Sequence, residues 1–345
     1  MDQYLGPPSA PMRPLMQLSA LADSLRLSYD AFLHELRFPS YHTFYVSKKD
    51  GSRRRIDAPM GETKRIQKRF ARNFQDFYGF MASPIAHGFI SDNVVTRSYG
   101  DIYTNARVHA GKKYVWNTDI ASFFPSITAR MVREALLNYG YTYSEDVAHA
   151  IALFCCRNGC LPQGSPASPA LSNMVCRHMD QELYELAQLN NISITRYADD
   201  ITCSSNDGIP HAFKDGLRAV LRSYGFTVQG RKERLQGRGQ RQMVTGLVVN
   251  EKPNVDRRTI RELRAVLYDW ERNGLAAAAA KYKRLPMDAP QPEAFFLYSL
   301  LARIGFVRYI RGKEDAIGLR MMEKWRGLVQ RDTMAGSDME GRNFG

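Results

Sequence analysis

The sequence contains few cysteines and no long hydrophobic run. Its five cysteines are an odd number without a Cys-x-x-Cys pair, which argues against a disulfide framework and against a zinc site. No stretch reaches the roughly 18 apolar residues that a membrane span requires. The N-terminus lacks a basic start followed by an apolar run, so we expect no signal peptide. These absences favour a reduced, cytoplasmic protein that does not associate with membranes.

The composition is that of a folded protein with a basic surface. Hydrophobic residues make up 44% of the 345 positions, which is enough for a sizeable core and excludes a wholly disordered or collagen-like chain. Lysine and arginine number 48 against 35 acidic residues, a net charge of +13. Such an excess indicates a polyanionic partner, although a merely solvated basic surface has the same composition.

The pattern of the chain predicts three parts. Residues 1–43 form a helical N-terminal extension, residues 44–250 mix strands with helices, and residues 251–345 are almost entirely helical. Alternation around Asp50-Gly51 predicts a hairpin over 44–57. We expect helices at 18–36, 128–139, 144–157, 166–189 and 210–224, and strands at 114–119, 192–197, 201–204 and 243–249. This order predicts an α+β fold with helices on one face of a sheet.

Tyr197-Ala198-Asp199-Asp200 lies between two apolar strands and is the sharpest chemical feature of the chain. Two adjacent carboxylates repel each other and favour a bound cation, and magnesium prefers such hard oxygen ligands. An ordinary polar hairpin turn is the alternative. Asp119, at the end of another predicted strand, would supply the third carboxylate of a two-metal site for phosphoryl or nucleotidyl transfer.

The loop from Leu161 to Pro169 is the second candidate feature. Gly164 allows the backbone to approach a ligand closely, and the following helix N-terminus offers N–H groups to an anion. Gln163 is placed to hydrogen-bond a nucleotide. Taken alone, the loop is better explained as a rigid turn.

In this order and spacing, Asp119 with Phe124, then Gln163-Gly164, then Tyr197 to Asp200 resemble the palm motifs of reverse transcriptases. The resemblance covers roughly residues 44–250. Two further signatures resemble those of retron reverse transcriptases: Asn105-Ala106-Arg107-Val108-His109, similar to N-A-x-x-H, and Val244-Thr245-Gly246.

The resemblance implies a right-hand polymerase fold with fingers, a ferredoxin-like palm sheet and a helical thumb, here residues 251–345. It also implies an RNA-directed DNA polymerase that copies part of its own structured noncoding RNA into a branched, RNA-linked single-stranded DNA. Its implied partners are that RNA and its DNA copy, deoxynucleoside triphosphates, and an effector or toxin protein in antiphage defence. Its implied cofactor is a pair of magnesium ions.

The resemblance also assigns roles to individual residues. Asp119, Asp199 and Asp200 would be catalytic metal ligands, with the backbone carbonyl of Ile120 as an additional ligand. It implies nucleotide binding by Phe124, Gln163, Gly164 and Lys232, and RNA binding by Asn105, His109, Val244, Thr245 and Gly246. Charge, rather than the resemblance, adds Arg55 and Arg72 as nucleotide-binding candidates and Arg257, Arg258 and Arg261 as RNA-binding candidates. Lys232 matches a lysine thought to protonate the pyrophosphate leaving group.

The basic positions leave alternatives open. From Lys48 to Arg72 the chain has ten basic residues and three acids, which suits a triphosphate site and an RNA-backbone patch equally. Lys232 is equally explained as one more phosphate-binding lysine, and the arginines after residue 251 as a solvated helix face. Competing functions are a group II intron-like or other bacterial reverse transcriptase, an RNA-dependent RNA polymerase, and an RNA–DNA scaffold for an effector.

Overall fold

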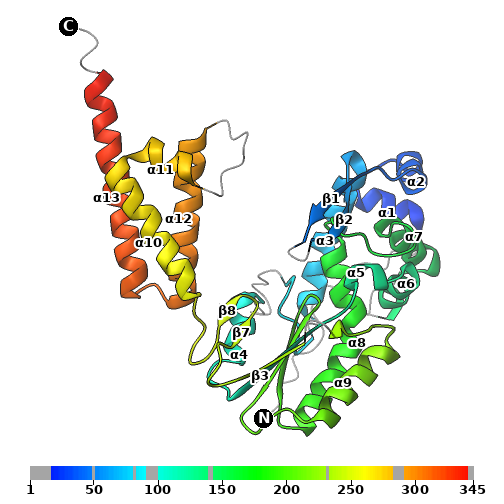
Figure 1. Cartoon of the computed structure of the whole chain (residues 1–345). Coiled ribbons are helices and arrows are strands. Elements are labelled where there is room, and N and C mark those ends of the chain that lie inside the picture. The colour runs from blue at the N-terminus through cyan, green and yellow to red at the C-terminus, as the bar shows by residue number, and fades with distance from the viewer. Residues whose placement is uncertain are drawn as a thin grey trace. The chain divides into compact units, whose positions relative to one another are not determined.

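In a computed structural model, the chain divides into two compact units, Met1–Gln240 and Arg241–Gly345 (Figure 1). The structure describes residues 17–48, 51–80, 83–90, 100–138, 143–230, 233–282 and 291–340, without the side chains of 76–80 and 333–340. Sequence analysis placed the second boundary after residue 250, so the division falls ten residues earlier, before the Val244-Thr245-Gly246 motif. Among the described helices, none has the length and apolar character needed to cross a bilayer.

The N-terminal unit begins with two short helices where the sequence predicted one. They are α1 (Leu18–Ser24) and α2 (Tyr29–Arg37). The break between them includes Arg26, whose φ of +55° is incompatible with a continuing helix. The Ser28 hydroxyl then caps α2 by accepting a hydrogen bond from the Ala31 N–H.

An antiparallel pair of strands follows. Strands β1 (Tyr41–Ser47) and β2 (Arg53–Pro59) form the predicted hairpin, although Asp50 itself lies outside the described residues. The 20-residue helix α3 (Gly61–Phe80) comes next and packs on α8.

The centre of this unit is a four-stranded antiparallel sheet of order β4-β5-β3-β6. The strands are β3 (Tyr114–Asp119), β4 (Ser193–Tyr197), β5 (Asp200–Ser205) and β6 (Arg234–Gly237). The first three were predicted, whereas β6 was not. Side chains alternate between the two faces, so Trp116 and Cys203 share one face, while Asp119, Asp200 and Thr202 share the other.

Helices cover the apolar face of the sheet. The helices of this part of the chain are α4 (Ile102–Val108), α5 (Phe123–Ser126), α6 (Ala129–Asn138), α7 (Glu145–Cys155), α8 (Ser168–Leu189) and α9 (His211–Ser223). Helices α8 and α9 pack on one another, and Lys214 of α9 lies over the Trp116 ring, 5.3 Å from its centroid. A single hydrophobic core joins Trp116 and Ile201 of the sheet to Met174 and Leu183 of α8. The predicted helix over 144–157 is confirmed as α7, with the Ser144 side chain as its cap.

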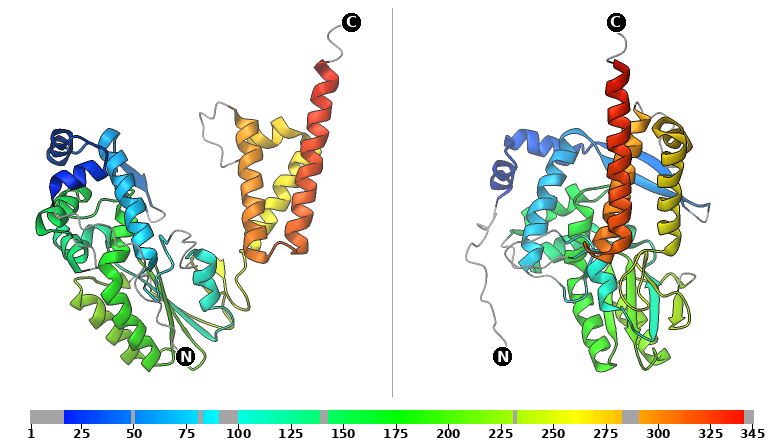
Figure 2. Two further views of the ribbon diagram at one scale, coloured as in Figure 1. Left: turned by 180° about the vertical axis from the view of Figure 1, so that it is seen from behind. Right: turned by 90° about the vertical axis from the view of Figure 1, so that its left-hand side faces the viewer.

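The C-terminal unit is helical. It contains α10 (Arg257–Asn273), α11 (Leu275–Lys281), α12 (Pro292–Arg311) and α13 (Ala316–Glu340), with α12 and α13 side by side (Figure 2). Trp270 and Phe296 pack edge to face in its core, their ring centroids 5.6 Å apart. The unit opens with a miniature hairpin of β7 (Met243–Val244) and β8 (Leu247–Val248).

That hairpin corrects the prediction of one strand over 243–249. Thr245 and Gly246 have φ values of +44° and +85°, so they form a two-residue turn rather than extended backbone. A turn with two positive φ values matches the right-handed twist of the strands that it joins. The Val-Thr-Gly motif is thus a turn sequence.

Candidate active site

Three carboxylates meet where β3 ends beside the β4–β5 hairpin. Asp119 is the last residue of β3 and lies directly opposite Asp200, the first residue of β5. Asp199 occupies the hairpin turn, and its carbonyl accepts a hydrogen bond of 2.9 Å from the Ile120 N–H. One side-chain oxygen from each aspartate lies within 4.8 Å of the other two. The predicted cluster is therefore assembled by strand register and by one turn.

The turn that carries Asp199 is tight and strained. Tyr197 pairs with Asp200, which leaves only Ala198 and Asp199 to reverse the chain. Ala198 has a φ of +57°, a left-handed conformation that costs an alanine about 1 kcal/mol or more. Gly88 lies against this turn so closely that a Cβ there would be 2.8 Å from the Ala198 nitrogen. The surrounding structure therefore holds the turn in place.

This carboxylate cluster fits a divalent cation. Asp119 is buried, Asp199 half-buried and Asp200 exposed, so the cluster has one side open to solvent. Three negative charges this close repel one another unless a cation lies between them, and magnesium and its analogues favour carboxylate oxygens. Ile120 is 1% exposed, and its proposed carbonyl ligation stays a prediction.

A basic pocket of about 310 Å³ lies between the β1–β2 hairpin and the loop before α8. Its lining comprises Lys48, Arg53, Arg54, Arg55, Asp57, Pro125, Arg157, Asn158, Cys160, Leu161, Pro162 and Gln163. Five of these side chains are cationic and one is anionic. Such a pocket is suited to a polyanionic ligand of the size of a phosphate chain.

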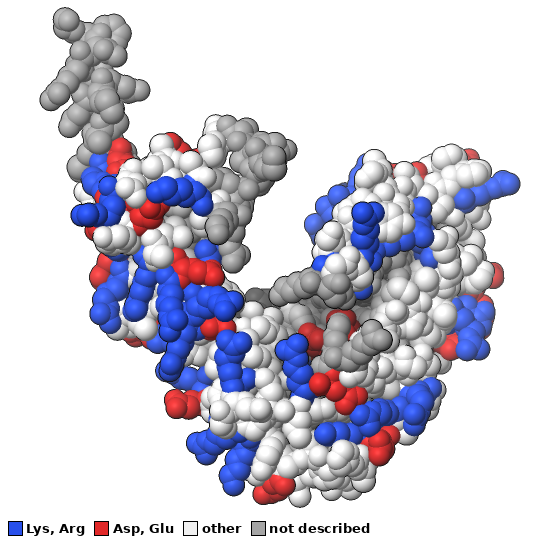
Figure 3. All heavy atoms as spheres, viewed as in Figure 1, with Lys and Arg blue, Asp and Glu red and all other residues white. Residues whose placement is uncertain are grey.

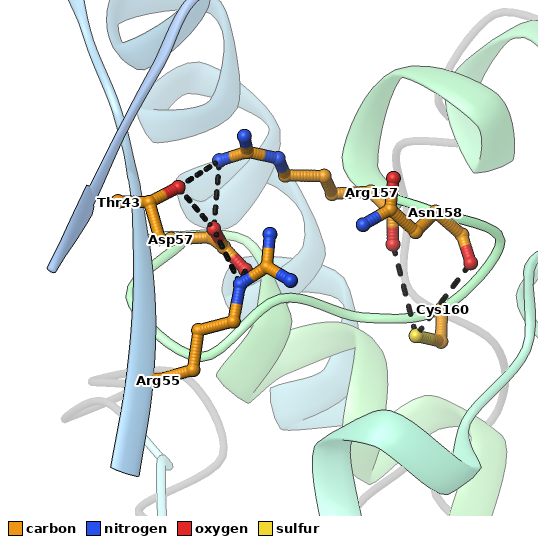
Figure 4. Close-up of polar contacts among 6 residues, drawn as sticks. All are labelled: Thr43, Arg55, Asp57, Arg157, Asn158 and Cys160. Atoms are coloured by element: carbon orange, nitrogen blue, oxygen red, sulfur yellow. Dashed lines mark hydrogen bonds and ion pairs between the residues drawn. The ribbon is translucent and has the colours of Figure 1, made fainter. Parts of the chain in front are cut away.

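Asp57 organises the pocket wall (Figure 4). Its carboxylate accepts hydrogen bonds from the Thr43 hydroxyl at 2.7 Å, from Arg157 at 2.7 Å and from the Nε of Arg55 at 3.2 Å. Arg157 also lies over the Tyr41 ring, 4.8 Å from its centroid. The β1–β2 hairpin and the loop before α8 are thereby joined through one buried carboxylate, beside which Arg55 also lines the pocket.

Gly164 contributes by its lack of a side chain. Its φ is +117°, and a Cβ at this position would lie 2.8 Å from the Cγ2 of Ile56 and 3.1 Å from the Asp57 carbonyl oxygen. The neighbouring Gln163 carbonyl accepts a 2.7 Å hydrogen bond from the Asp57 N–H. The glycine lets the loop lie against β2, which places Gln163 in the pocket wall.

A row of aromatic rings links the pocket to the carboxylate hairpin. Phe124 precedes the pocket residue Pro125, and its ring centroid is 6.2 Å from that of Phe89. Phe89 in turn lies 6.3 Å from Tyr197. Sequence analysis missed Phe89, whose only unusual property is structural: its φ is +62°, rare for an aromatic residue.

The N-A-x-x-H segment packs on the β4–β5 hairpin, on the face of the sheet that carries Asp119 and Asp200. Asn105 and His109 are 1% and 0% exposed. The two ring nitrogens of His109 lie 2.7 Å from the hydroxyl of Ser204 on β5 and 2.7 Å from that of Thr195 on β4. Burial lowers the pKa of His109 from 6.5 to about 3. The imidazole is thus a neutral bridge between the two strands of the hairpin, and RNA binding by this segment stays a prediction.

The other predicted binding residues are distributed over both units. Arg72 is exposed on α3 and does not line the pocket. Lys232 lies outside the described residues. Val244, Thr245 and Gly246 form the β7–β8 turn of the C-terminal unit.

Helix α10 presents a basic surface. Arg257, Arg258 and Arg261 are all exposed on its first two turns, and Arg264 continues the same face. Lys and Arg side chains gather on the visible side of this unit (Figure 3). The arrangement suits a phosphate backbone, and the roles of the individual arginines stay predictions.

Comparison with known proteins bears directly on this site. A family model described as reverse transcriptase (RNA-dependent DNA polymerase) matches residues 46–239. The Retron Ec86 reverse transcriptase of Escherichia coli is 31% identical over 233 residues, covering 66% of this chain and 69% of that protein. The Retron Mx65 reverse transcriptase of Myxococcus xanthus is 33% identical over 259 residues, covering 69% of this chain and 57% of that protein.

Among solved structures, a telomerase from Candida albicans aligns with a TM-score of 0.48 at 8% identity, covering 84% of this chain and 63% of that chain. This likeness is too weak to add to the sequence relationship. The matched region, residues 46–239, contains all three aspartates of the cluster and every residue that lines the basic pocket. The chain belongs to the reverse transcriptases, the RNA-directed DNA polymerases, and within them to the retron reverse transcriptases.

Proposed function

We propose that this reverse transcriptase copies part of its own structured noncoding RNA into a branched, RNA-linked single-stranded DNA, and that it works with an effector protein in antiphage defence. The observation that carries the catalytic part is the meeting of Asp119, Asp199 and Asp200, with side-chain oxygens within 4.8 Å of one another. Family membership supports RNA as template and deoxynucleoside triphosphates as substrates.

The three aspartates hold two magnesium ions in this proposal. When bound, two such ions stabilise the attacking and leaving oxygens of an in-line displacement. The role of the chain is to fix the three carboxylates at the end of the sheet. Asp119 and Asp199 are the principal ligands, and Asp200 is more peripheral, in line with its greater exposure.

The basic pocket binds the triphosphate of the incoming nucleotide. Arg55 is held by Asp57 through Nε, so its terminal nitrogens remain directed at a phosphate. Gln163 lines the same pocket and supplies an uncharged amide for the nucleotide. Lys232 belongs to this group as a candidate proton donor to the leaving pyrophosphate.

Phe124 selects the sugar. It follows Asp119 by five residues, and its ring packs against Phe89, 6.2 Å away, and against Phe123, 5.4 Å away. A ring held from two sides cannot move aside when a ribose 2′-hydroxyl approaches, so deoxyribonucleotides are preferred.

The C-terminal unit acts as the thumb and binds RNA. The exposed arginines at the start of α10 support this role, because they offer several cations along one helix face. Phosphate neutralisation by such a face releases counterions and makes affinity depend strongly on salt.

The central test is Asp199→Asn, which keeps the shape of the side chain and removes its charge. DNA synthesis with magnesium should fall by orders of magnitude while RNA binding persists. Asp207→Asn, in the exposed segment after β5, is the matched control and should leave synthesis unchanged. Full activity of the Asp199 variant would refute the assignment. Purifying the protein from its host and sequencing the nucleic acid bound to it distinguishes a retron RNA from an intron or other template.

The pocket assignment has a separate test through Cys160. This is the one cysteine that is not buried, and it lines the basic pocket. Deoxynucleoside triphosphate should protect it from a maleimide reagent, and Cys160→Ser should abolish labelling altogether. Labelling at an unchanged rate with saturating nucleotide would place the triphosphate elsewhere.

A further inference from the structure

We propose that Arg196, clamped by Asp180 and Asn173 of α8, is a positioning residue that fixes the peptide before Asp199 and thereby sets the metal-binding geometry. The inference rests on the proposed function, since it assigns a task to residues that support the carboxylate cluster. Arg196 touches neither substrate nor metal in this scheme. It acts on the backbone of the turn.

The contact with the turn is direct. The Nη1 of Arg196 donates a 3.0 Å hydrogen bond to the carbonyl of Ala198. The Ala198 carbonyl is part of the peptide bond that joins Ala198 to Asp199. The hydrogen bond therefore fixes the plane of this peptide, and with it the position of the Asp199 Cα that carries the side chain. Ala198 has a φ of +57°, a conformation that persists only where the surroundings enforce it.

The guanidinium itself is held without freedom to rotate. Asp180 accepts from its Nε at 2.6 Å and from its Nη2 at 2.7 Å, and the Asn173 side-chain oxygen accepts from Nη2 at 3.1 Å. The side chains of Arg196 and Asp180 are both 0% exposed. A planar fork bound along two edges has one orientation, and here that orientation aims Nη1 at the turn.

Asn173 also supports the turn from a second side. Its amide nitrogen donates a 2.8 Å hydrogen bond to the Gly88 carbonyl. Gly88 lies against the turn, where a Cβ would be 2.8 Å from the Ala198 nitrogen. One side chain of α8 therefore holds both the arginine and the glycine that enclose Ala198.

Stability is a weak explanation for this network. A buried ion pair loses so much hydration that well-packed apolar residues often replace it without loss of stability. An apolar pair would fill the volume between β4 and α8, but it would offer no donor to the Ala198 carbonyl. The directional contact is what the arginine adds.

The test is a double variant, Arg196→Met with Asp180→Leu. It removes both charges of the pair together, so that neither is left buried without its partner. The readouts are calorimetric binding of Mn²⁺ without substrate, the Tm, and kcat and KM for a deoxynucleoside triphosphate. The matched control is Arg311→Met with Asp315→Leu, which removes another two-bonded Arg–Asp pair, in the C-terminal unit.

We expect the charge-free variant to fold, to bind Mn²⁺ about 10- to 100-fold more weakly, and to lose kcat with KM unchanged, whereas the control binds Mn²⁺ normally. Normal Mn²⁺ affinity and kcat in the folded variant would overturn the inference. If that variant does not fold, Arg196→Lys, which keeps the charge but lacks the fork, decides by the same titration. Should Asp199→Asn be inactive while the charge-free variant binds Mn²⁺ normally, only this inference fails. An active Asp199→Asn would refute the proposed function instead.

Discussion

The lowered pKa of the buried His109 predicts that the folded protein loses stability in mild acid. The folded chain keeps the pKa of this imidazole near 3, well below its ordinary 6.5, because the ring is fully buried between Thr195 and Ser204. A neutral imidazole donates through one nitrogen and accepts through the other, which suits two hydroxyls. Protonation makes both nitrogens donors, so one hydrogen bond must reverse inside the core.

The sign follows from proton uptake. Below pH 6.5 the unfolded chain binds a proton at His109, while the folded chain does not bind one until about pH 3. The stabilisation is therefore complete above pH 6.5 and declines as pH falls from 6.5 towards 3. Each pH unit in this window costs about 1.4 kcal/mol, so the loss at pH 5.0 is about 2 kcal/mol.

Urea unfolding at pH 7.5 and 5.0 measures this loss. Trp116 is buried in the sheet of the N-terminal unit, whereas Trp270 and Trp325 belong to the C-terminal unit. A Trp270→Phe, Trp325→Phe background therefore makes Trp116 the only tryptophan reporter. In that background His109→Gln should have lower stability at pH 7.5 but lose about 2 kcal/mol less than its parent between the two pH values.

The same substitution at an exposed histidine, His149→Gln, is the control and should keep the full pH dependence of the parent. An equal loss of stability in the His109 variant and its parent would show that the buried imidazole is not what titrates. The reasoning about the hydroxyl bridge would then be wrong.

Two further predictions concern the substrate and the template. Phe124→Val should admit ribonucleotides much more readily, as measured by competition between dNTP and NTP. The control Phe32→Val, in α2 of the N-terminal segment, should leave this selectivity unchanged. Unchanged selectivity in Phe124→Val would show that the ring does not contact the sugar. Replacement of Arg257, Arg258 and Arg261 by alanine should weaken RNA binding and flatten its dependence on salt, by roughly one unit of log–log slope for each phosphate that is no longer neutralised. A triple variant with the affinity and slope of the parent would assign these arginines to a solvated helix face.

Much of the catalytic cluster could be predicted from sequence because its determinants are local. Tyr197 to Asp200 lies between two apolar runs, and two residues suffice to reverse antiparallel strands. Asp119 ends the short apolar run that begins at Tyr114, so its place at a strand end was predictable as well. What the sequence could not specify is the strand register that sets Asp119 opposite Asp200. Register depends on pairing between segments some eighty residues apart in the chain.

The errors have equally physical causes. Val244-Thr245-Gly246 follows an apolar pattern and was predicted as strand, but apolar alternation does not report φ, and both Thr245 and Gly246 have positive values. Strand β6 escaped prediction because its residues are largely polar, as expected for an edge strand paired on one side only. The RNA-binding role of Asn105 and His109 rests on the resemblance alone and stays a prediction, whereas the burial of His109 could not be read from the sequence.

Sequence analysis missed the structural roles of three buried polar residues, one of which, His109, it had assigned to RNA binding. Asp57 joins the hairpin to the loop of Gln163, His109 joins β4 to β5, and Arg196 joins the Asp199 turn to α8. Each is buried, and each bonds to groups far away in the sequence. The hydrophobic effect is non-directional, whereas a hydrogen bond specifies direction as well as distance. The chemistry of this site depends on the spacing of three carboxylates, so the elements that carry them need directional contacts to hold them in place. The partners in these contacts are distant in the sequence and can be identified only in the folded chain.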